Sequence, residues 1–218
     1  KKYIEKNYKK SFFDRLIRNF LSKVLTNIKL FRFLIYFVKL IKPFNFLFPS
    51  IIKNMIVLVP TTISKKKLKI KDIYKVKNKK KIARVMLLTG CVQKEISPQI
   101  NEATISILNR HGIEVVVSKK VQCCGSLDHH LGKEENAHKH FINNINVWYE
   151  EYLKNGLDAI LSNTSGCGTT MKDYGFIFRN NKIINKKAKK ISELSKDISE
   201  YLFESLNLKF QKNHKKLR

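Results

Sequence analysis

The chain has 218 residues, a formal net charge of +27 and 43% hydrophobic residues. This length suits one ordinary domain with an appendage, or two small domains, and the hydrophobic content is sufficient for a core. The opening KKYIEKNYKK resembles no secretory signal peptide. We therefore expect a cytoplasmic protein, in which four cysteines are better evidence for metal or redox chemistry than for disulfides.

The positive charge is unevenly distributed along the chain. Residues 1–82 carry 23 Lys and Arg against 3 acidic residues, whereas residues 83–173 carry 9 against 10 and residues 174–218 carry 12 against 4. All four cysteines lie in the nearly neutral central segment. The abundance of Lys, Asn and Ile is also what A/T-rich codons encode. A nucleic-acid partner is therefore unlikely, despite the net charge.

Residues 1–60 are predicted to form a basic amphipathic helical arm. Between Phe13 and Ile35 apolar residues recur at three- or four-residue steps, with Lys and Arg largely between them, and Pro43 and Pro49 then interrupt the helices. No stretch reaches the ~18–20 apolar residues that a membrane span needs. Two interpretations stay open: the arm packs on the domain or on a neighbouring polypeptide, or it lies on an anionic membrane surface such as the inner face of the plasma membrane. Residues 61–82 read as a lysine-rich linker in which no compact element is expected.

Residues 83–178 alternate between strand and helix patterns. RVMLLTGC is an apolar strand that runs into a Gly-Cys turn, and residues 98–111 read as a helix that begins at Pro98 and ends at Gly112. IEVVVS is a second strand, residues 133–156 are a long helix, and LDAILSNTSGCG is a third strand with a second Gly-Cys turn. This order predicts an α/β fold with a parallel sheet. Residues 179–218 would add trailing helices, one of them over residues 183–206, towards a second module.

The four cysteines follow the three predicted strands. Cys91 comes after the first strand, Cys123 and Cys124 after the second, and Cys167 after the third. Parallel strands bring their carboxyl ends to one edge of the sheet, where ligands of such folds bind. We therefore expect the four sulfurs to converge on one point.

Glycines beside these cysteines strengthen the prediction of a cofactor site. Gly125 and Gly168 allow unusual backbone angles, and their amides can approach and donate to sulfur. Four thiolates could bind an iron–sulfur cluster or a tetrahedral zinc ion. The alternative without a ligand is that the cysteines are small buried apolar residues.

The segments LLTGCVQ, QCCGSL and NTSGCGTTMKDYG together resemble the cysteine-rich CCG module of heterodisulfide-reductase-like proteins. This family includes the iron–sulfur subunits of bacterial glycolate oxidases and lactate-utilisation proteins, and the resemblance is dense over residues 84–175. It implies that Cys91, Cys123, Cys124 and Cys167 bind an iron–sulfur cluster, by count a [4Fe-4S] cluster. In the fullest CCG pattern the last element is C-x-x-C, and here Thr164 stands at the first of these two positions. An unusual cluster, zinc or an empty redox pocket therefore stay open.

The resemblance implies an electron-transfer subunit of a glycolate or other 2-hydroxy-acid oxidase complex, with no catalytic residue of its own. Electrons would come from FAD on partner subunits and pass towards a membrane acceptor such as quinone. Family members typically carry an N-terminal ferredoxin-like domain, and this sequence contains no C-x₂-C-x₂-C-x₃-C-P run for such a domain. The alternative function is a structural zinc-binding or cofactor-free assembly module of a related complex.

Overall fold

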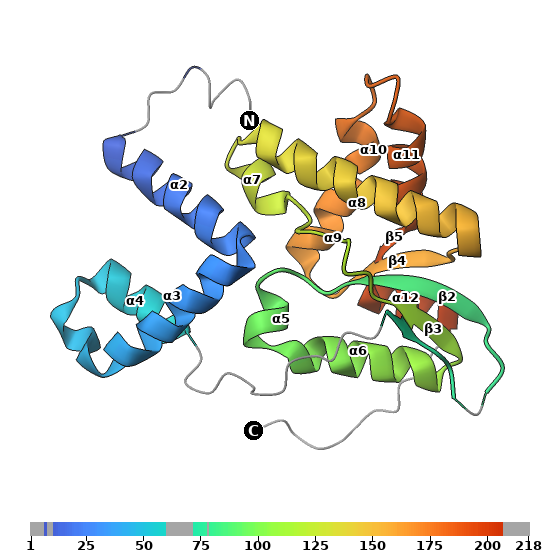
Figure 1. Cartoon of the computed structure of the whole chain (residues 1–218), viewed down its shortest axis with the longest axis horizontal. Coiled ribbons are helices and arrows are strands. Elements are labelled where there is room, and N and C mark those ends of the chain that lie inside the picture. The colour runs from blue at the N-terminus through green and yellow to red at the C-terminus, as the bar shows by residue number, and fades with distance from the viewer. Residues whose placement is uncertain (1–6, 8–10, 60–71, 78, 207–218) are drawn as a thin grey trace.

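The computed structural model describes residue 7 and residues 11–59, 72–77 and 79–206. These residues form an arm of helices beside a layered α/β module (Figure 1). Both parts of the predicted fold class, the parallel α/β module and the preceding basic helical arm, are confirmed. The expectations for residues 1–6, 8–10, 60–71, 78 and 207–218, which include most of the linker segment and the end of the chain, lie outside the described residues.

Two helices form the first half of the arm, because a polar cap interrupts the helical pattern at Asn27. Helix α2 (Phe12–Thr26) starts after Ser11, and helix α3 (Ile28–Ile41) starts after Asn27. The Asn27 Oδ1 atom accepts hydrogen bonds from the next two free backbone N–H groups, at 3.1 and 3.2 Å. Such a cap satisfies donors that a new helix would otherwise leave unpaired.

Two prolines divide the second half of the arm into short helices, as the sequence predicted. The 3₁₀-helix η1 (Lys42–Leu47) has Pro43 in its first turn, and helix α4 (Ser50–Leu58) follows Pro49. A proline lacks the backbone donor that an established helix needs, so it is tolerated only where a helix begins. Among the described helices, none is both long and apolar enough to cross a membrane.

The sheet of the module has five strands in the order β1-β3-β2-β4-β5. Parallel pairing joins β2 to β3, β2 to β4 and β4 to β5, whereas β1 pairs antiparallel with β3. The strands are β1 (Ile73–Tyr74), β2 (Ala83–Leu88), β3 (Ile113–Val116), β4 (Ala159–Ser162) and β5 (Ser195–Asp197). The central strands β2, β3 and β4 are the three that the sequence predicted.

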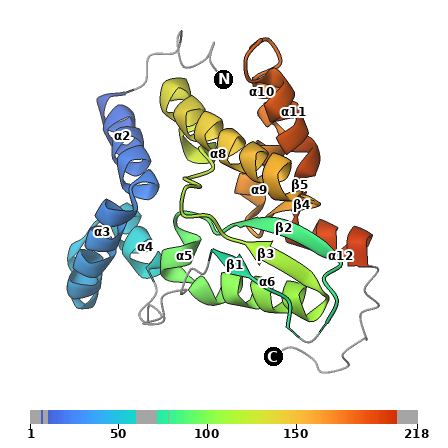
Figure 2. The same ribbon diagram turned by 45° about the vertical axis from the view of Figure 1, so that its right-hand side comes forward.

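Helices cover both faces of the sheet (Figure 2), which explains why the central strands are almost continuously apolar. In β2, Val85 and Leu87 pack into one core with helix α6 (Pro98–Arg110) and helix α12 (Ile198–Leu206). Met86 and Leu88 point to the other face and pack into the second core. That core is built on α8 (Glu134–Asn155), α9 (Ser165–Lys172), α10 (Tyr174–Ile177) and α11 (Asn185–Leu194).

The two outer strands differ from the sequence-based expectations. Strand β1 lies in the segment interpreted as a linker, and β5 divides residues 183–206, which were expected to form a single helix, into α11 and α12. Both are very short edge strands, and the residues of β5 are polar. Edge pairing uses backbone groups on one side only, so it requires no apolar side-chain pattern that a sequence would reveal.

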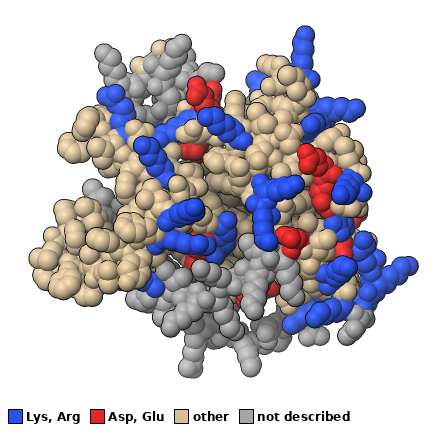
Figure 3. Space-filling model, viewed as in Figure 1, with Lys and Arg blue, Asp and Glu red and all other residues tan. Residues whose placement is uncertain are grey.

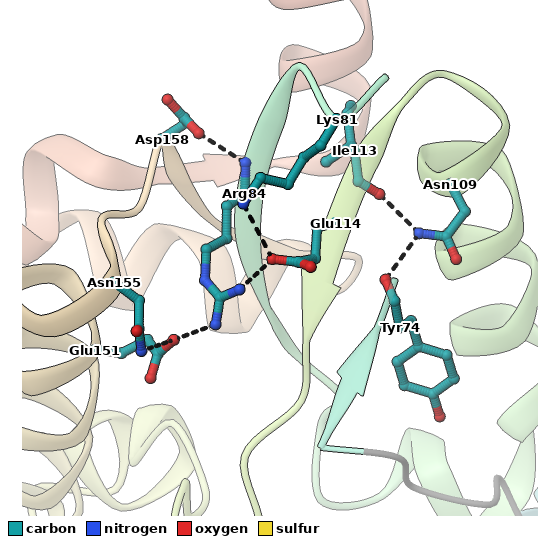
Figure 4. Close-up of polar contacts among 9 residues, drawn as sticks. All are labelled: Tyr74, Lys81, Arg84, Asn109, Ile113, Glu114, Glu151, Asn155 and Asp158. Carbon is teal, nitrogen blue, oxygen red and sulfur yellow. Dashed lines mark hydrogen bonds and ion pairs between the residues drawn. The ribbon is translucent and has the colours of Figure 1, made fainter. Parts of the chain in front are cut away.

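A charged cluster closes the edge of the sheet where the parallel strands begin (Figure 4). The Arg84 guanidinium, at the start of β2, is paired with Glu114 on β3 and with Glu151 on α8, the latter at 2.5 Å. The Arg84 backbone N–H donates to Asp158, just before β4, at 2.7 Å. Burial lowers the Arg84 pKa, but the hydrogen bonds to the two Glu residues outweigh it, so that the pKa is raised overall. This edge is stabilised by charge pairing, and it lies opposite the edge that carries the cysteines.

Candidate thiol-rich cofactor site

The structure places all four predicted cysteines at the carboxyl edge of the sheet. Cys91 follows β2, Cys123 and Cys124 follow β3, and Cys167 lies in the first turn of α9, after β4. The Sγ atoms of Cys91 and Cys123 are 3.6 Å apart, and those of Cys124 and Cys167 are 3.0 Å apart. Cys124 is buried and the other three thiols are half-buried. The topology therefore brings together thiols from three segments that are far apart in the sequence.

The thiols form two close pairs instead of one convergent group. Within the part of the chain that the structure describes, no three His, Cys, Asp or Glu side chains are arranged so that they could bind one metal ion. The two pairs are joined through Cys123 and Cys124, which are neighbours in the chain. The sulfurs thus make a row, Cys91–Cys123–Cys124–Cys167, and their convergence on one point stays a prediction.

The electrostatics favour the neutral thiol over the thiolate at Cys91, Cys123 and Cys124. The contact with Cys124 is the main cause that raises the pKa of Cys123 to about 12, with burial adding to it. The pKa of Cys91 is raised by its contact with Cys123 and by burial. For Cys124 the contact with Cys123 lowers the pKa, but the contact with Cys167 and burial together outweigh this effect, so that the pKa is raised overall. Several buried negative charges at this spacing repel one another, and a bound cation removes that penalty. The donor set therefore suits a soft cationic group such as iron or zinc.

Backbone groups next to the thiols partly offset the cost of negative charge on the sulfurs. The backbone groups of Val92, Gly125 and Ser126 lower the pKa of the thiols of Cys91, Cys123 and Cys124, respectively. Amide donors of this kind stabilise negative sulfur and tune the potential of iron–sulfur groups.

Gly125 is required by the shape of the loop that carries the cysteine pair. Its φ is +77°, and it precedes the short helix α7 (Ser126–His130). A Cβ atom at this position would lie 2.5 Å from Cε1 of Phe141 and 3.1 Å from the carbonyl oxygen of Ala137. Only glycine combines this backbone angle with this close approach, so that α8 fixes the path of the cysteine loop.

The predicted site residue Gly168 has a different environment. It is buried in α9, where a Cβ atom would make only an ordinary contact, 3.6 Å from the Cβ atom of Ser162. Its N–H donates to the carbonyl oxygen of Thr164 at 3.0 Å. These contacts give Gly168 a packing role, and its role in cofactor binding stays a prediction.

The sequence reasoning missed Asn144, which fixes the cysteine loop to α8. Its Oδ1 atom accepts from the N–H of Gln122 at 2.8 Å, and its Nδ2 atom donates to the carbonyl oxygen of Cys123 at 2.9 Å. Asn144 is fully buried next to Phe141 and Ile145. A polar residue within the apolar stripe of a helix is the signal that could have identified it, because buried amides need partners.

Tyr174 also binds the loop that carries Cys123 and Cys124. Its hydroxyl donates to the carbonyl oxygen of Cys124 at 2.7 Å, and its side chain is fully buried. Burial is the main cause that raises its pKa well above the usual value, and the nearby thiols add to it. Tyr174 is therefore a neutral hydrogen-bond donor at the site.

Thr164, which stands where the fuller pattern has a fifth cysteine, takes part in a polar network. Its hydroxyl donates to Oε1 of Gln93, and the Gln93 amide donates to Asn163 at 2.9 Å. Asn163 in turn donates to Asn101 at 2.9 Å, and Asn101 donates to the carbonyl oxygen of Thr89 at 2.9 Å. This network joins the loop before Cys91 to the loop before Cys167, so the Thr164 side chain ties the two loops together.

The arm contributes to one wall of the site. The Ser22 hydroxyl on α2 donates to Oδ1 of Asp128 at 2.5 Å, and both side chains are buried. A cavity of about 240 Å³ lies beside the Cys91–Cys123 pair, and Thr26 and Ile28 of the arm line it. The arm and the cysteine loops therefore meet directly next to the thiols.

Comparison with known proteins finds one matching family model and several relatives. Residues 85–172 match the family model described as CCG, cysteine-rich domain. The chain is 40% identical over 121 residues to the glycolate oxidase iron-sulfur subunit of Escherichia coli (strain K12), a stretch that covers 56% of this chain and 30% of that protein. It is 27% identical over 121 residues to a Bacillus subtilis protein named as a probable glycolate oxidase iron-sulfur subunit, covering 56% of this chain and 26% of that protein.

A third relative is the lactate utilization protein A 1 of Bacillus cereus, 22% identical over 125 residues, which cover 57% of this chain and 50% of that protein. The aligned stretches thus span between about a quarter and a half of these relatives. No solved structure matches the chain.

Proposed function

We propose that this chain is an electron-transfer element of an oxidoreductase that binds an iron–sulfur cluster through Cys91, Cys123, Cys124 and Cys167, because residues 85–172 match the cysteine-rich CCG domain. The observation that carries the proposal is the row of four half-buried or buried thiols, with Sγ–Sγ distances of 3.6 and 3.0 Å at its two ends. Four thiols and no competing carboxylate in the row are the donor set that iron–sulfur groups use. A cluster of the [4Fe-4S] type agrees with the number of thiols.

The residues around the thiols would orient them and exclude water. Asn144 and Tyr174 fix the carbonyl groups of Cys123 and Cys124, and Gly125 lets the loop pass close to Phe141. The bound cluster would supply reversible one-electron storage, and the protein would set its potential through amide donors and burial.

The similarity to glycolate oxidase iron-sulfur subunits supports a more specific role in oxidation of glycolate or another 2-hydroxy acid. We infer that electrons reach this chain from FAD on partner subunits and leave it towards a membrane acceptor such as quinone. The chain would work peripherally at the inner face of the plasma membrane. Similarity to a lactate utilization protein supports the wider substrate class of 2-hydroxy acids.

The second candidate function is a structural module that binds zinc or no cofactor. Its support is the arrangement of the thiols as two pairs, which four-coordinate zinc could draw together. In that case the domain would stabilise a complex without carrying electrons.

Anaerobic reconstitution with iron and sulfide distinguishes these functions. We expect a brown protein whose visible absorption bleaches, and whose EPR signal changes, when a reduced flavin is added as electron donor, and both changes should reverse on reoxidation. A colourless protein that takes up zinc and shows no reducible signal would contradict the electron-transfer role and favour the structural one.

A further inference from the structure

An apolar groove runs along the inner side of the arm. It encloses about 600 Å³, and all fourteen residues that line it are apolar. Twelve of them come from α2, α3, α4 and the residue that follows α4, and the other two, Val92 and Ile96, lie in the segment of the module that follows Cys91. The arm helices thus have more apolar surface than they bury against one another.

A second apolar surface covers the outer side of the arm. Phe33, Tyr36, Phe37 and Leu40 form a stripe along one face of α3, and each is between 52% and 65% exposed. At the end of this stripe, Phe44, Phe46 and Leu47 of η1 are also strongly exposed. We call these seven residues the apolar tip. In Figure 3 the lobe over α3, η1 and α4 is almost continuously tan, and Lys and Arg side chains appear where this lobe adjoins the module.

The arm that carries the apolar tip has charges of almost one sign. Residues 11–59 contain eight Lys and Arg and a single acidic residue, Asp14. Helical periodicity places Arg32 and Lys39 along one edge of the stripe on α3, where Arg32 is also paired with Glu95 of the module. Long basic side chains can extend beside an apolar face and keep their charges in the head-group region.

From this combination we infer that the arm docks on a bilayer surface that contains anionic phospholipid, with the apolar tip inserted at the head-group boundary. An anionic bilayer supplies apolar depth and negative charge over the same surface, which matches Phe and Leu side chains flanked by cations. No helix in the described residues spans a membrane, so the contact is interfacial.

The docking deepens the proposed function by naming the surface that meets the membrane. The hydrogen bond from Ser22 to Asp128 and the ion pair from Arg32 to Glu95 attach the arm to the cysteine loops. Thr26 and Ile28 line the cavity beside Cys91 and Cys123. Docking through the apolar tip therefore holds the thiol site near the bilayer, where a membrane acceptor would be reached.

Vesicle sedimentation with the full chain tests this inference. We expect binding to vesicles of equal parts phosphatidylglycerol and phosphatidylcholine, little binding to phosphatidylcholine alone, and a loss of roughly tenfold in bound fraction at high salt. The variant Phe33→Ser/Phe37→Ser should lose most of this binding. The matched control Leu153→Ser/Phe203→Ser, at apolar positions on α8 and α12 that are even more exposed, should bind as the unmodified chain does.

Tryptophan variants keep the inference testable even if the serine variants fail to fold. Phe46→Trp should show a blue shift of tryptophan emission with the anionic vesicles, whereas Leu153→Trp should show none, and buried Trp148 gives the same background in both.

Three results would overturn the inference. The chain could bind both kinds of vesicle equally, or the arm and control variants could have equal effects. The chain could also bind no vesicles and self-associate through the arm. Lipid binding does not require a cluster. A chain that binds vesicles but no iron would therefore refute the proposed function alone, and one that binds iron but no vesicles would refute the docking alone.

Discussion

At the scale of single residues, the site depends on backbone positions as much as on the thiols. Cys91, Cys123, Cys124 and Cys167 could be identified from their positions after apolar strands, because topology alone brings such positions to one edge. Asn144 could not, since its role depends on which loop α8 packs against. The pairing of the sulfurs depends on side-chain orientation, which no sequence pattern specifies.

Replacement of Gly125 by alanine should be strongly destabilising. The new Cβ atom would require a left-handed backbone angle and would overlap the ring of Phe141, at a combined cost of roughly 2–4 kcal/mol. Thermal unfolding of the cofactor-free chain measures this. The control is Gly166→Ala in α9, where a Cβ atom meets nothing within 4 Å and the expected effect is within about 1 kcal/mol. Equal stability of the two variants would contradict the assignment of Gly125.

Replacement of Asn144 by leucine should weaken both stability and cofactor retention. The change removes the hydrogen-bond partner of the N–H of Gln122 and of the carbonyl of half-buried Cys123, at a total cost of about 1–3 kcal/mol. We expect a lower melting temperature and a faster release of iron to a chelator. Glu150→Ala, on the exposed face of the same helix, should change neither quantity. Normal iron retention in Asn144→Leu would show that α8 does not position the cysteine loop.

At the scale of elements, local signals were sufficient wherever the chain itself marks a boundary. Pro98 begins α6, and Gly112 and Gly156, both with positive φ, follow the ends of α6 and α8. The sequence did not reveal β1 and β5, because short edge strands carry no apolar alternation. Helix α7 was hidden inside a loop for a similar reason, since five residues are too few for a helical period.

The contact between the arm and the module should depend on Ser22. Replacing Ser22 by alanine leaves Oδ1 of buried Asp128 without this donor, at a cost of about 1–3 kcal/mol. We expect α2 and α3 to be cleaved faster in limited proteolysis followed by mass spectrometry. Lys23→Gln, at the neighbouring exposed position, serves as the control. If the two variants are cleaved at the same rate, the Ser22–Asp128 bond does not attach the arm.

At the scale of the whole molecule, the two edges of the sheet have separate roles. The edge where the strands begin is closed by the Arg84 cluster (Figure 4), and the edge where they end carries the thiols. A change at the first edge should therefore alter stability without altering the composition of the site.

Arg84→Met tests this separation. Removing the guanidinium leaves the buried carboxylate of Glu114 without its main partner, which costs roughly 3–5 kcal/mol. The double variant Arg84→Met/Glu114→Leu should recover much of the loss, because an apolar pair replaces the ion pair. Chemical denaturation measures both values. Folded Arg84→Met should take up as much iron as the unmodified chain, and a selective loss of iron would contradict the separation of the two edges.

The measurement that tests the central claim most directly is the iron and acid-labile sulfide content of the chain purified anaerobically, beside the variant Cys123→Ser/Cys124→Ser. If the row of thiols binds an iron–sulfur cluster, the unmodified chain will contain iron and sulfide in equal amounts, about four of each per chain for a [4Fe-4S] cluster. The double variant will contain almost none of either while keeping its fold by circular dichroism. Full iron and sulfide in the folded double variant, or zinc in place of iron in the unmodified chain, would contradict the claim.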